Sequence, residues 1–299
     1  MNLKKGRFDM LKIGMVGAEN SHTAAIAKVL NIDKKIRGVR ATHVWGETPA
    51  FARAAAEKGQ IPTIVRRPEE MIGEVDAIVV DHRHGKFHLP AVMPFLETKV
   101  PLFIDKPFCY RRAEGRRFLA RARELGVPVC SFSTLPKQAS FRKLVGEVRK
   151  LGAIQTVVST GPCDIKSKWG GIFFYGIHQV DMLLRLIGYD FHRVQVVKGA
   201  GGNHAAHILF RSGVVATMNL IGPGARPAFH ISIIAEKGRL DMEINMDASP
   251  YLTGVRDFVR MFKTGRSEET EETMLGPVAV LESLEKSVKS PHARVGAGV

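Results

Sequence analysis

A lysine at residue 106 is the strongest single candidate for chemistry in this chain. Asp105-Lys106-Pro107 directly follows residues 100–104, a short apolar run that predicts a buried strand. Open α/β sheets bind their ligands beyond the carboxyl ends of their strands. A lysine at that place can donate or accept a proton in general acid–base catalysis. The alternative interpretation is a surface lysine on a strand-to-helix loop.

A second candidate group lies on the predicted helix 173–187, which is apolar on nearly every side. His178, Asp181 and Arg185 fall at i, i+3 and i+7 and so share one polar stripe. Such a stripe either forms its own structural pairing or faces a cleft. In the second case Asp181 can orient His178 for proton transfer.

The first predicted strand runs into a turn and then a helix, where a dinucleotide-binding fold places its glycine-rich loop. Gly17 stands at the first glycine position, but Glu19 and His22 stand at the second and third. Asn20 and Ser21 are good helix caps, and the first N–H groups of the helix can bind a phosphate. The alternative is a strand-to-helix turn that binds no ligand.

An acidic residue follows the second predicted strand, residues 38–45. Such a residue binds the adenosine ribose of NAD. Glu47 is available for this role, although Gly46 stands at the usual position. The sequence therefore favours NAD over NADP without deciding between them.

Three histidines follow the fourth predicted strand, residues 75–80. Their spacing, H-x-H-x-x-x-H over residues 82–88, has no carboxylate that would complete a metal site, so no metal is expected. We interpret this loop as the lining of a cleft. Asp81 and His82 are then expected near the nicotinamide of a bound cofactor, and His88 at the start of the next helix.

The order of apolar runs and helical patterns predicts an α/β protein of two domains. Residues 1–133 alternate between strands and helices, which predicts a Rossmann-type doubly wound parallel sheet of six strands. Residues 134–299 carry a run of consecutive strands and few helices, which predicts an α+β domain with a mostly antiparallel open sheet. Near its end we expect an acidic loop over residues 266–273, before a last helix from residue 277.

Composition and charge bound the class of protein. The chain has 299 residues, of which 45% are hydrophobic and 24% are charged, as in ordinary globular proteins, and no apolar run reaches the length of a membrane span. Cys109, Cys130 and Cys163 form no paired motif, so we expect a reducing, cytoplasmic compartment. The net charge of +15 is spread along the chain. It favours a solvated basic surface over nucleic-acid binding.

Four motifs, taken in order, resemble the Gfo/Idh/MocA family of NAD(P)-dependent oxidoreductases. They are the glycine turn after the first strand, the strand that leads to His88, Asp105-Lys106-Pro107 in place of the family's Glu-Lys-Pro, and residues 176–181 with Gly170-Gly171 upstream. The chain departs from the family in the turn, which lacks two glycines, and at Phe174, where an aspartate is frequent.

The resemblance implies an NAD(P)-dependent dehydrogenase that acts on a sugar- or polyol-like substrate and forms a homo-oligomer through its C-terminal sheet. It implies that Lys106 and His178 are catalytic, and that the substrate is bound by Lys106, Tyr175, His178 and Asp181. The expected cofactor-binding residues are Gly17, Ala18, Glu19, Asn20, Ser21, His22, Glu47, Asp81, His82, His88, Asp105 and Pro107.

Two other function classes stay open at this point. One is a non-catalytic ligand-binding or regulatory protein on the same fold, which the altered turn and Phe174 favour. The other is a basic nucleic-acid binder, which rests on net charge alone. The departures at Glu19 and His22 make cofactor binding the property to examine first.

Overall fold

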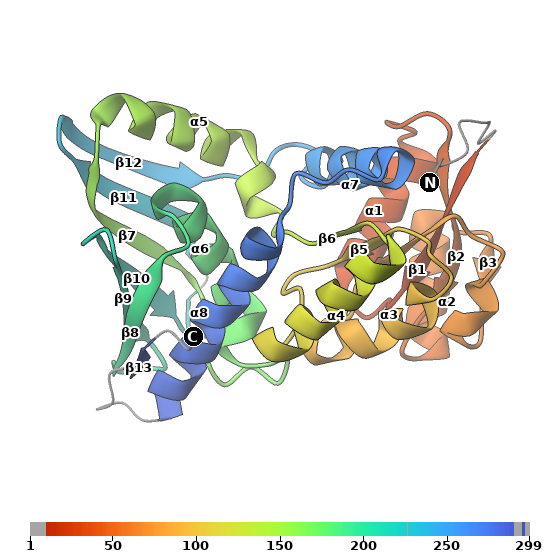
Figure 1. Cartoon of the computed structure of the whole chain (residues 1–299), viewed down its shortest axis with the longest axis horizontal. Helices are drawn as coiled ribbons and strands as arrows, with labels where there is room; N and C mark the ends of the chain where they lie inside the picture. The colour runs from red at the N-terminus through yellow and green to blue at the C-terminus, as the bar shows by residue number, and fades with distance from the viewer. Residues whose placement is uncertain (1–9, 226, 290–294, 297–299) are drawn as a thin grey trace.

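Two sheets organise the chain, and they lie at opposite ends of the molecule (Figure 1). The computed structural model describes residues 10–225, 227–289 and 295–296. Within these residues the N-terminal part of the chain forms one sheet of six strands, and the C-terminal part forms one of seven. The predicted combination of α/β classes is confirmed.

The first sheet is parallel throughout, with the strand order β3-β2-β1-β4-β5-β6. This is the order of a dinucleotide-binding fold, and it reverses direction between β1 and β4. Its strands are β1 Leu11–Val16, β2 Val39–Trp45, β3 Thr63–Ile64, β4 Ala77–Val80, β5 Leu102–Ile104 and β6 Val129–Cys130.

Burial explains why these strands read as apolar runs. All four residues of β4 and all three of β5 are buried, because helices cover both faces of the sheet. The helices between the strands are α1 Ser21–Ala27, continued by a π-helical turn Lys28–Ile32, then α2 Pro49–Gly59, α3 His88–Leu96 and α4 Arg112–Leu125.

The second sheet has the order β12-β11-β7-β10-β9-β8-β13. Only β7 and β10 pair in parallel; the other described neighbours are antiparallel. Its strands are β7 Ile154–Pro162, β8 Phe191–Lys198, β9 His204–Phe210, β10 Val215–Ile221, β11 Phe229–Ala235, β12 Gly238–Ile244 and β13 Val295–Gly296.

Helices α5 (Ala139–Val148), α6 (Ile172–Ile187) and α8 (Glu271–Lys289) lie on the same side of this sheet, the side toward the rest of the molecule (Figure 1). The acidic loop expected over residues 266–273 is only partly correct, because α8 already begins at Glu271. Acidic residues stabilise the first turn of a helix, since they face its positive dipole end. Glu271 and Glu272 therefore start the helix instead of extending the loop.

The helix α7 (Leu252–Thr264) returns to the first sheet although it follows the second in sequence. Phe258 stacks on Phe103 of β5, with the ring centroids 4.6 Å apart and the planes 29° apart. The aromatic pair joins α7 to the core that contains β1 and β2. The domain division expected between residues 133 and 134 stays a prediction, since this later segment shares the core of the first sheet.

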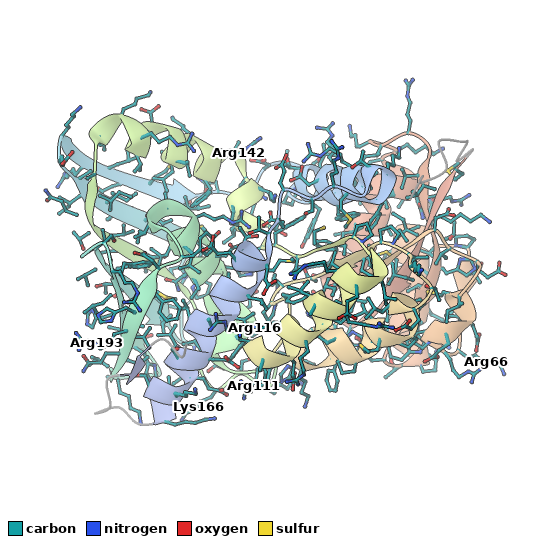
Figure 2. All side chains as sticks on the ribbon, viewed as in Figure 1. Arg66, Arg111, Arg116, Arg142, Lys166 and Arg193 are labelled. Carbon is teal, nitrogen blue, oxygen red and sulfur yellow. The ribbon has the colours of Figure 1, made fainter. Side chains whose placement is uncertain are left out.

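Basic side chains are distributed over the surface, although five arginines stand on α4. Arg66, Arg142 and Arg193 lie in separate regions of the molecule (Figure 2). This distribution agrees with a solvated basic surface. None of the helices in the described residues is both long and apolar enough to cross a membrane.

Candidate active site

Three neighbouring strands bring the candidate residues to one edge of the first sheet. β1 leads into Gly17, β4 into Asp81, and β5 into Asp105 and Lys106. Backbone hydrogen bonds hold these strand ends in register, since the N–H of Asp81 donates to Val16 and that of Asp105 to Val80, both at 2.8 Å. The site expected at the carboxyl ends of the strands therefore exists as a spatial cluster.

The turn after β1 requires glycine at its first position. Gly17 has a φ of +105°, and a Cβ there would lie 2.8–2.9 Å from backbone atoms of Asp81 and His82. No L side chain fits that space without moving the backbone. The close approach of the β1 and β4 ends is thus built on this one glycine.

Glu47 closes the turn from the end of β2. Its Oε2 accepts hydrogen bonds from the N–H groups of Ala18 and Glu19, both at 2.9 Å. Its Oε1 is buried and has no hydrogen-bond partner in the described part of the chain. A buried acceptor without a donor is unusual, and a ribose hydroxyl would supply one. The turn and Glu47 therefore fit the adenosine ribose of a dinucleotide.

The second glycine position, Glu19, remains partly exposed. Burial and the charge of Glu47 raise the pKa of its carboxyl, whereas Arg83 and Lys168 lower it. Ser21 begins α1 and is exposed, and the preceding Asn20 caps the helix through a 3.4 Å contact with the N–H of His22. These residues border the space beside the turn.

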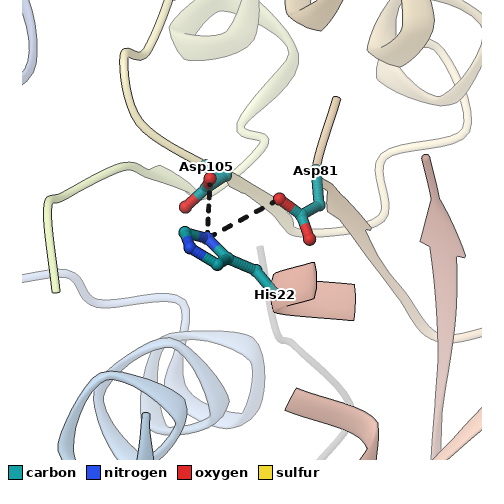
Figure 3. Close-up of side chains that lie close together, drawn as sticks. All are labelled: His22, Asp81 and Asp105. Carbon is teal, nitrogen blue, oxygen red and sulfur yellow. Dashed lines mark hydrogen bonds and ion pairs between the residues drawn. The ribbon is translucent and has the colours of Figure 1, made fainter. Parts of the chain in front are cut away.

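His22 forms a buried charge cluster with two aspartates (Figure 3). Its Nδ1 lies 3.0 Å from Oδ2 of Asp105 and 3.8 Å from Oδ1 of Asp81. The amide of Asn20 donates to Asp81 at 2.7 Å. The third glycine position thus carries an imidazole that is held by the ends of β4 and β5.

The pKa values of the two aspartates are shifted in opposite directions. Burial alone would raise the pKa of Asp105, but the charge and hydrogen bond of His22 hold it well below its usual range. Burial and the negative charge of Asp105 raise the pKa of Asp81 well above its usual range. The hydroxyl of Thr23 lies 2.7 Å from the carbonyl of Gly17 and 2.8 Å from Oδ2 of Asp81, and its hydrogen bond opposes the rise in the pKa of Asp81 without cancelling it.

The side-chain atoms of His22, Asp81 and Asp105 lie within 4.8 Å of one another, a spacing also found around metal ions. The Nδ1 of His22 bonds Asp105 directly, and both oxygens of Asp81 accept hydrogen bonds, from Asn20 and Thr23. The cluster therefore acts as a hydrogen-bonded charge group, and no metal is assigned to it.

Lys106 and His178 are the two candidate catalytic residues, and both are buried. The Nζ of Lys106 lies 5.4 Å from the ring centroid of Phe174 and has no hydrogen bond or ion pair among the described residues. Burial lowers the pKa of His178 well below its usual range, and the charge of Lys106 lowers it further. His178 is therefore a neutral imidazole close to an unpaired amine.

Ser133, and not Asp181, orients His178. The Nδ1 of His178 lies 2.7 Å from the hydroxyl oxygen of Ser133. Asp181 instead accepts hydrogen bonds from Arg185 at 2.8 Å and from the N–H of Ser133 at 3.2 Å. The expectation that Asp181 orients His178 is wrong. Arg185 lies one turn further along α6, four residues after Asp181, and it binds the carboxylate in place of His178. Its expected contact with substrate has no support, since Asp181 is buried and fully engaged.

The histidines of the loop after β4 serve different purposes. His88 is fully buried, and its nitrogens lie 2.7 Å from the carbonyl of Pro107 and 2.8 Å from that of His82. His88 and Pro107 therefore brace the β4 and β5 loops from inside, and the structure does not place His88 in the cleft as expected. His82 is buried, its Nδ1 has no partner in the described residues, and burial lowers its pKa to about 3.

Two residues outside the sequence prediction complete the cleft. Ser133 lies three residues beyond the end of β6, the last strand of the first sheet, so the strand-end rule that identified Lys106 also applied to it. Arg83 lies over the rings of Trp169 and Phe174. No spacing in the sequence signals that contact. Tyr175 borders the same cleft, with its ring 5.7 Å from that of His178.

Comparison with known proteins agrees with this geometry. The sequence model of the GFO_IDH_MocA oxidoreductase family, described as having an NAD-binding Rossmann fold, matches residues 11–132. No match was found among curated protein sequences.

Several solved structures share the fold of the whole chain. A probable dehydrogenase from Thermotoga maritima has a TM-score of 0.80 and 18% identity, with 96% of this chain and 99% of that one covered. Scyllo-inositol dehydrogenase from Lactobacillus casei, solved with NAD(H) and scyllo-inositol, has a TM-score of 0.83 and 16% identity, with coverage of 96% and 99%. GenD2 from gentamicin A biosynthesis, solved with NAD, has a TM-score of 0.83 and 15% identity, and both chains are covered completely.

The resemblance found in the motifs is thus confirmed by the family match and by the fold. The match covers the domain that holds the turn, the charge cluster and Lys106. Residues 11–132 match the model of the Gfo/Idh/MocA oxidoreductase family with its NAD-binding Rossmann fold, and nearly the whole chain shares the fold of solved dehydrogenases.

Proposed function

We propose that this protein is a cytoplasmic NAD-dependent oxidoreductase that acts on a sugar- or polyol-like substrate. The observation that carries the proposal is the meeting of Lys106 and His178 beside the turn of an NAD-binding domain. The neighbours solved with inositols and NAD(H) support the substrate and cofactor classes. The free, buried thiols of the described chain support a reducing compartment.

The cofactor would be held by the Gly17 turn and by Glu47, whose free oxygen would accept from a ribose hydroxyl. NAD supplies hydride acceptance and donation when bound. Ala18, Glu19, Asn20, Ser21, His22, Asp81 and His82 border this space and are proposed to contact the cofactor. Asp105 is proposed to hold His22 in position for the cofactor through its bond to that imidazole.

The protein groups would manage the proton that accompanies hydride transfer. Lys106 would take the proton from a substrate hydroxyl during oxidation and return it during reduction. The Nδ1 of His178 is occupied by Ser133, so Nε2 is the nitrogen left to bind the same substrate oxygen. A neutral imidazole suits this role, because it can donate a hydrogen bond without adding a second positive charge beside the one that Lys106 carries once it holds the proton.

We also propose that the second sheet joins two copies of this chain. Its face opposite α5, α6 and α8 has no covering helix in the described residues (Figure 1). Val215, Thr156 and Ile234 are in register on three adjacent strands of that face, and Val215 and Ile234 are 38% and 51% exposed. Apolar side chains in a row on an open sheet favour a protein contact.

Replacement of Lys106 by Met tests the catalytic proposal. Met retains the length of the side chain but cannot carry a proton, so we expect turnover to fall by about 10²- to 10⁴-fold. NADH affinity and melting temperature are expected to stay near those of the wild type. Lys150→Met, in the exposed turn that follows α5, is the control for loss of one charge. Equal turnover of the Lys106 variant and the control would refute the role.

Replacement of Glu47 by Gln tests the cofactor proposal. We expect NADH binding, measured by fluorescence titration, to weaken about 10-fold, because a neutral amide accepts more weakly from ribose hydroxyls than a carboxylate. The wild type is expected to prefer NADH to NADPH, whose 2′-phosphate the carboxylate repels. Glu57→Gln on the exposed side of α2 is the matched control. If NADH binds neither wild type nor variant, the non-catalytic alternative replaces the proposal.

Replacement of Ser133 tests how His178 is held. Loss of one hydrogen bond costs about 1 kcal/mol, so Ser133→Ala is expected to lower kcat roughly 5- to 10-fold. Ser133→Thr keeps the hydroxyl and should restore most of the activity, while NADH affinity stays constant in both. If Ser133→Thr is as slow as Ser133→Ala although it is folded and binds NADH, the hydroxyl does not position His178.

Light scattering of the purified protein tests the proposed contact between sheets. We expect at least a dimer, and we expect Ile234→Lys to shift it toward the monomer, because a charge at the centre of an apolar contact loses its hydration. Met246→Lys is a control at an exposed apolar position outside the strands. A monomeric wild type at micromolar concentration would contradict this contact.

A further inference from the structure

A cleft of about 330 Å³ lies between the two sheets, next to the N-terminal half of α6. Arg83 reaches it from the loop after β4, Phe174 and Tyr175 from α6, and Gly222 from the turn after β10. Elements from both sheets therefore form its walls. Because Phe174 also contacts Lys106, the cleft adjoins the proposed catalytic group.

Arg83 is fixed in this cleft by two aromatic rings. Its guanidinium carbon lies 4.8 Å from the ring centroid of Trp169 and 5.3 Å from that of Phe174. Contacts over ring faces stabilise a guanidinium without using its N–H donors. The side chain is half-buried, and it has no hydrogen bond and no ion pair with any described residue. Arg83 therefore presents unused donors from a fixed position.

The charges around Arg83 leave an excess of positive charge. Lys168 lies over the ring of Trp169, with Nζ 4.6 Å from the ring centroid, and Lys106 faces Phe174. Two acidic residues are near. Asp164 lines the cleft and accepts a hydrogen bond from the N–H of Lys166 at 2.8 Å, and Glu19 is close enough for the charge of Arg83 to lower its pKa. Neither carboxylate comes within 4.0 Å of Arg83 as an ion pair in the described structure.

We propose that Arg83 is a specificity residue that binds an anionic group of the substrate, which would make the substrate a sugar acid or sugar phosphate and not a neutral polyol. A planar guanidinium with free donors matches a carboxylate or phosphate through two parallel hydrogen bonds. A neutral substrate would cover Arg83 without supplying the missing counter-charge, at a cost in desolvation. The position that would carry an aspartate holds Phe174, which removes a negative charge that would repel such a group.

This inference deepens the proposed function and rests on it, because the bound anion is a substrate only if the protein is an oxidoreductase. The anionic group that Arg83 binds has a second possible source, since the pyrophosphate of the cofactor is also anionic. The two sources predict different effects of Arg83 on ligand affinity. Loss of Arg83 should weaken an acidic sugar if the source is the substrate, and NADH if it is the cofactor.

Calorimetric titration with matched sugars tests the proposal. D-glucuronate and D-galacturonate are compared with D-glucose and D-galactose, and glucose 6-phosphate is included, each with and without saturating NADH. The proteins are wild type, Arg83→Met and Arg142→Met. Met keeps the volume between the two rings, and Arg142 on α5 is exposed and does not line the cleft, which makes it the control for loss of one charge.

We expect the wild type and the Arg142 variant to bind an acidic sugar at least 10-fold more tightly than its neutral partner. In the Arg83 variant we expect that preference to fall about 10- to 100-fold, as for loss of a charged hydrogen-bond pair, with NADH affinity unchanged. Equal binding of acidic and neutral sugars by the wild type, or no binding of any of the acids, overturns the proposal. Weaker NADH binding with an unchanged sugar preference assigns Arg83 to the cofactor and also overturns it.

The design separates this inference from the proposed function. If acidic sugars bind through Arg83 but NADH does not bind at all, the oxidoreductase proposal fails and the anion site stands as that of a binding protein. If NADH binds and neutral polyols are turned over equally by the wild type and the Arg83 variant, the oxidoreductase proposal stands and the anion site fails.

Discussion

The burial of Asp105 and Lys106 at the end of β5 is the constraint on which the site depends. Both residues are less than 10% exposed, so two opposite charges lie where water cannot hydrate them well. Their neighbours must then be neutral or oppositely charged. His22 pairs with Asp105, burial and the charge of Asp105 raise the pKa of Asp81, and His178 stays neutral beside Lys106. The protonation pattern of the cleft follows from this one buried dipeptide.

A chain of buried ion pairs fixes α6 against the first sheet. Asp181 binds Arg185 at 2.8 Å, Arg185 binds Glu269 at 2.7 Å, and Glu269 binds Lys137 at 3.0 Å. Such networks add little net stability, but they penalise any arrangement that leaves a charge unpaired. Because Asp181 also accepts the N–H of Ser133, the same network sets the distance between Ser133 and His178. The polar stripe on α6 is therefore structural at Asp181 and Arg185, and faces the candidate catalytic lysine at His178.

The altered glycine turn keeps the part that the backbone requires and changes the parts that face the ligand. Gly17 cannot be replaced, because its Cβ would collide with the end of β4. The later positions tolerate side chains, since Glu19 points to partly exposed space and His22 turns inward to Asp105. The imidazole at position 22 thereby becomes the partner that keeps Asp105 ionised. The departure from the glycine pattern at His22 therefore supplies the partner of Asp105, the carboxylate buried at the end of β5.

The sequence by itself determined the order of the elements, the six-stranded parallel sheet and the residues at its strand ends. These follow from local rules: buried parallel strands read as apolar runs, and ligands bind where such strands end. The tertiary structure alone decided which of those residues touch. Ser133 orients His178, His88 braces two loops, and Arg83 lies between Trp169 and Phe174, because segments 19 to 91 positions apart meet in space. Periodicity and spacing describe a segment and its neighbours in sequence, and no such pattern encodes contacts between distant segments.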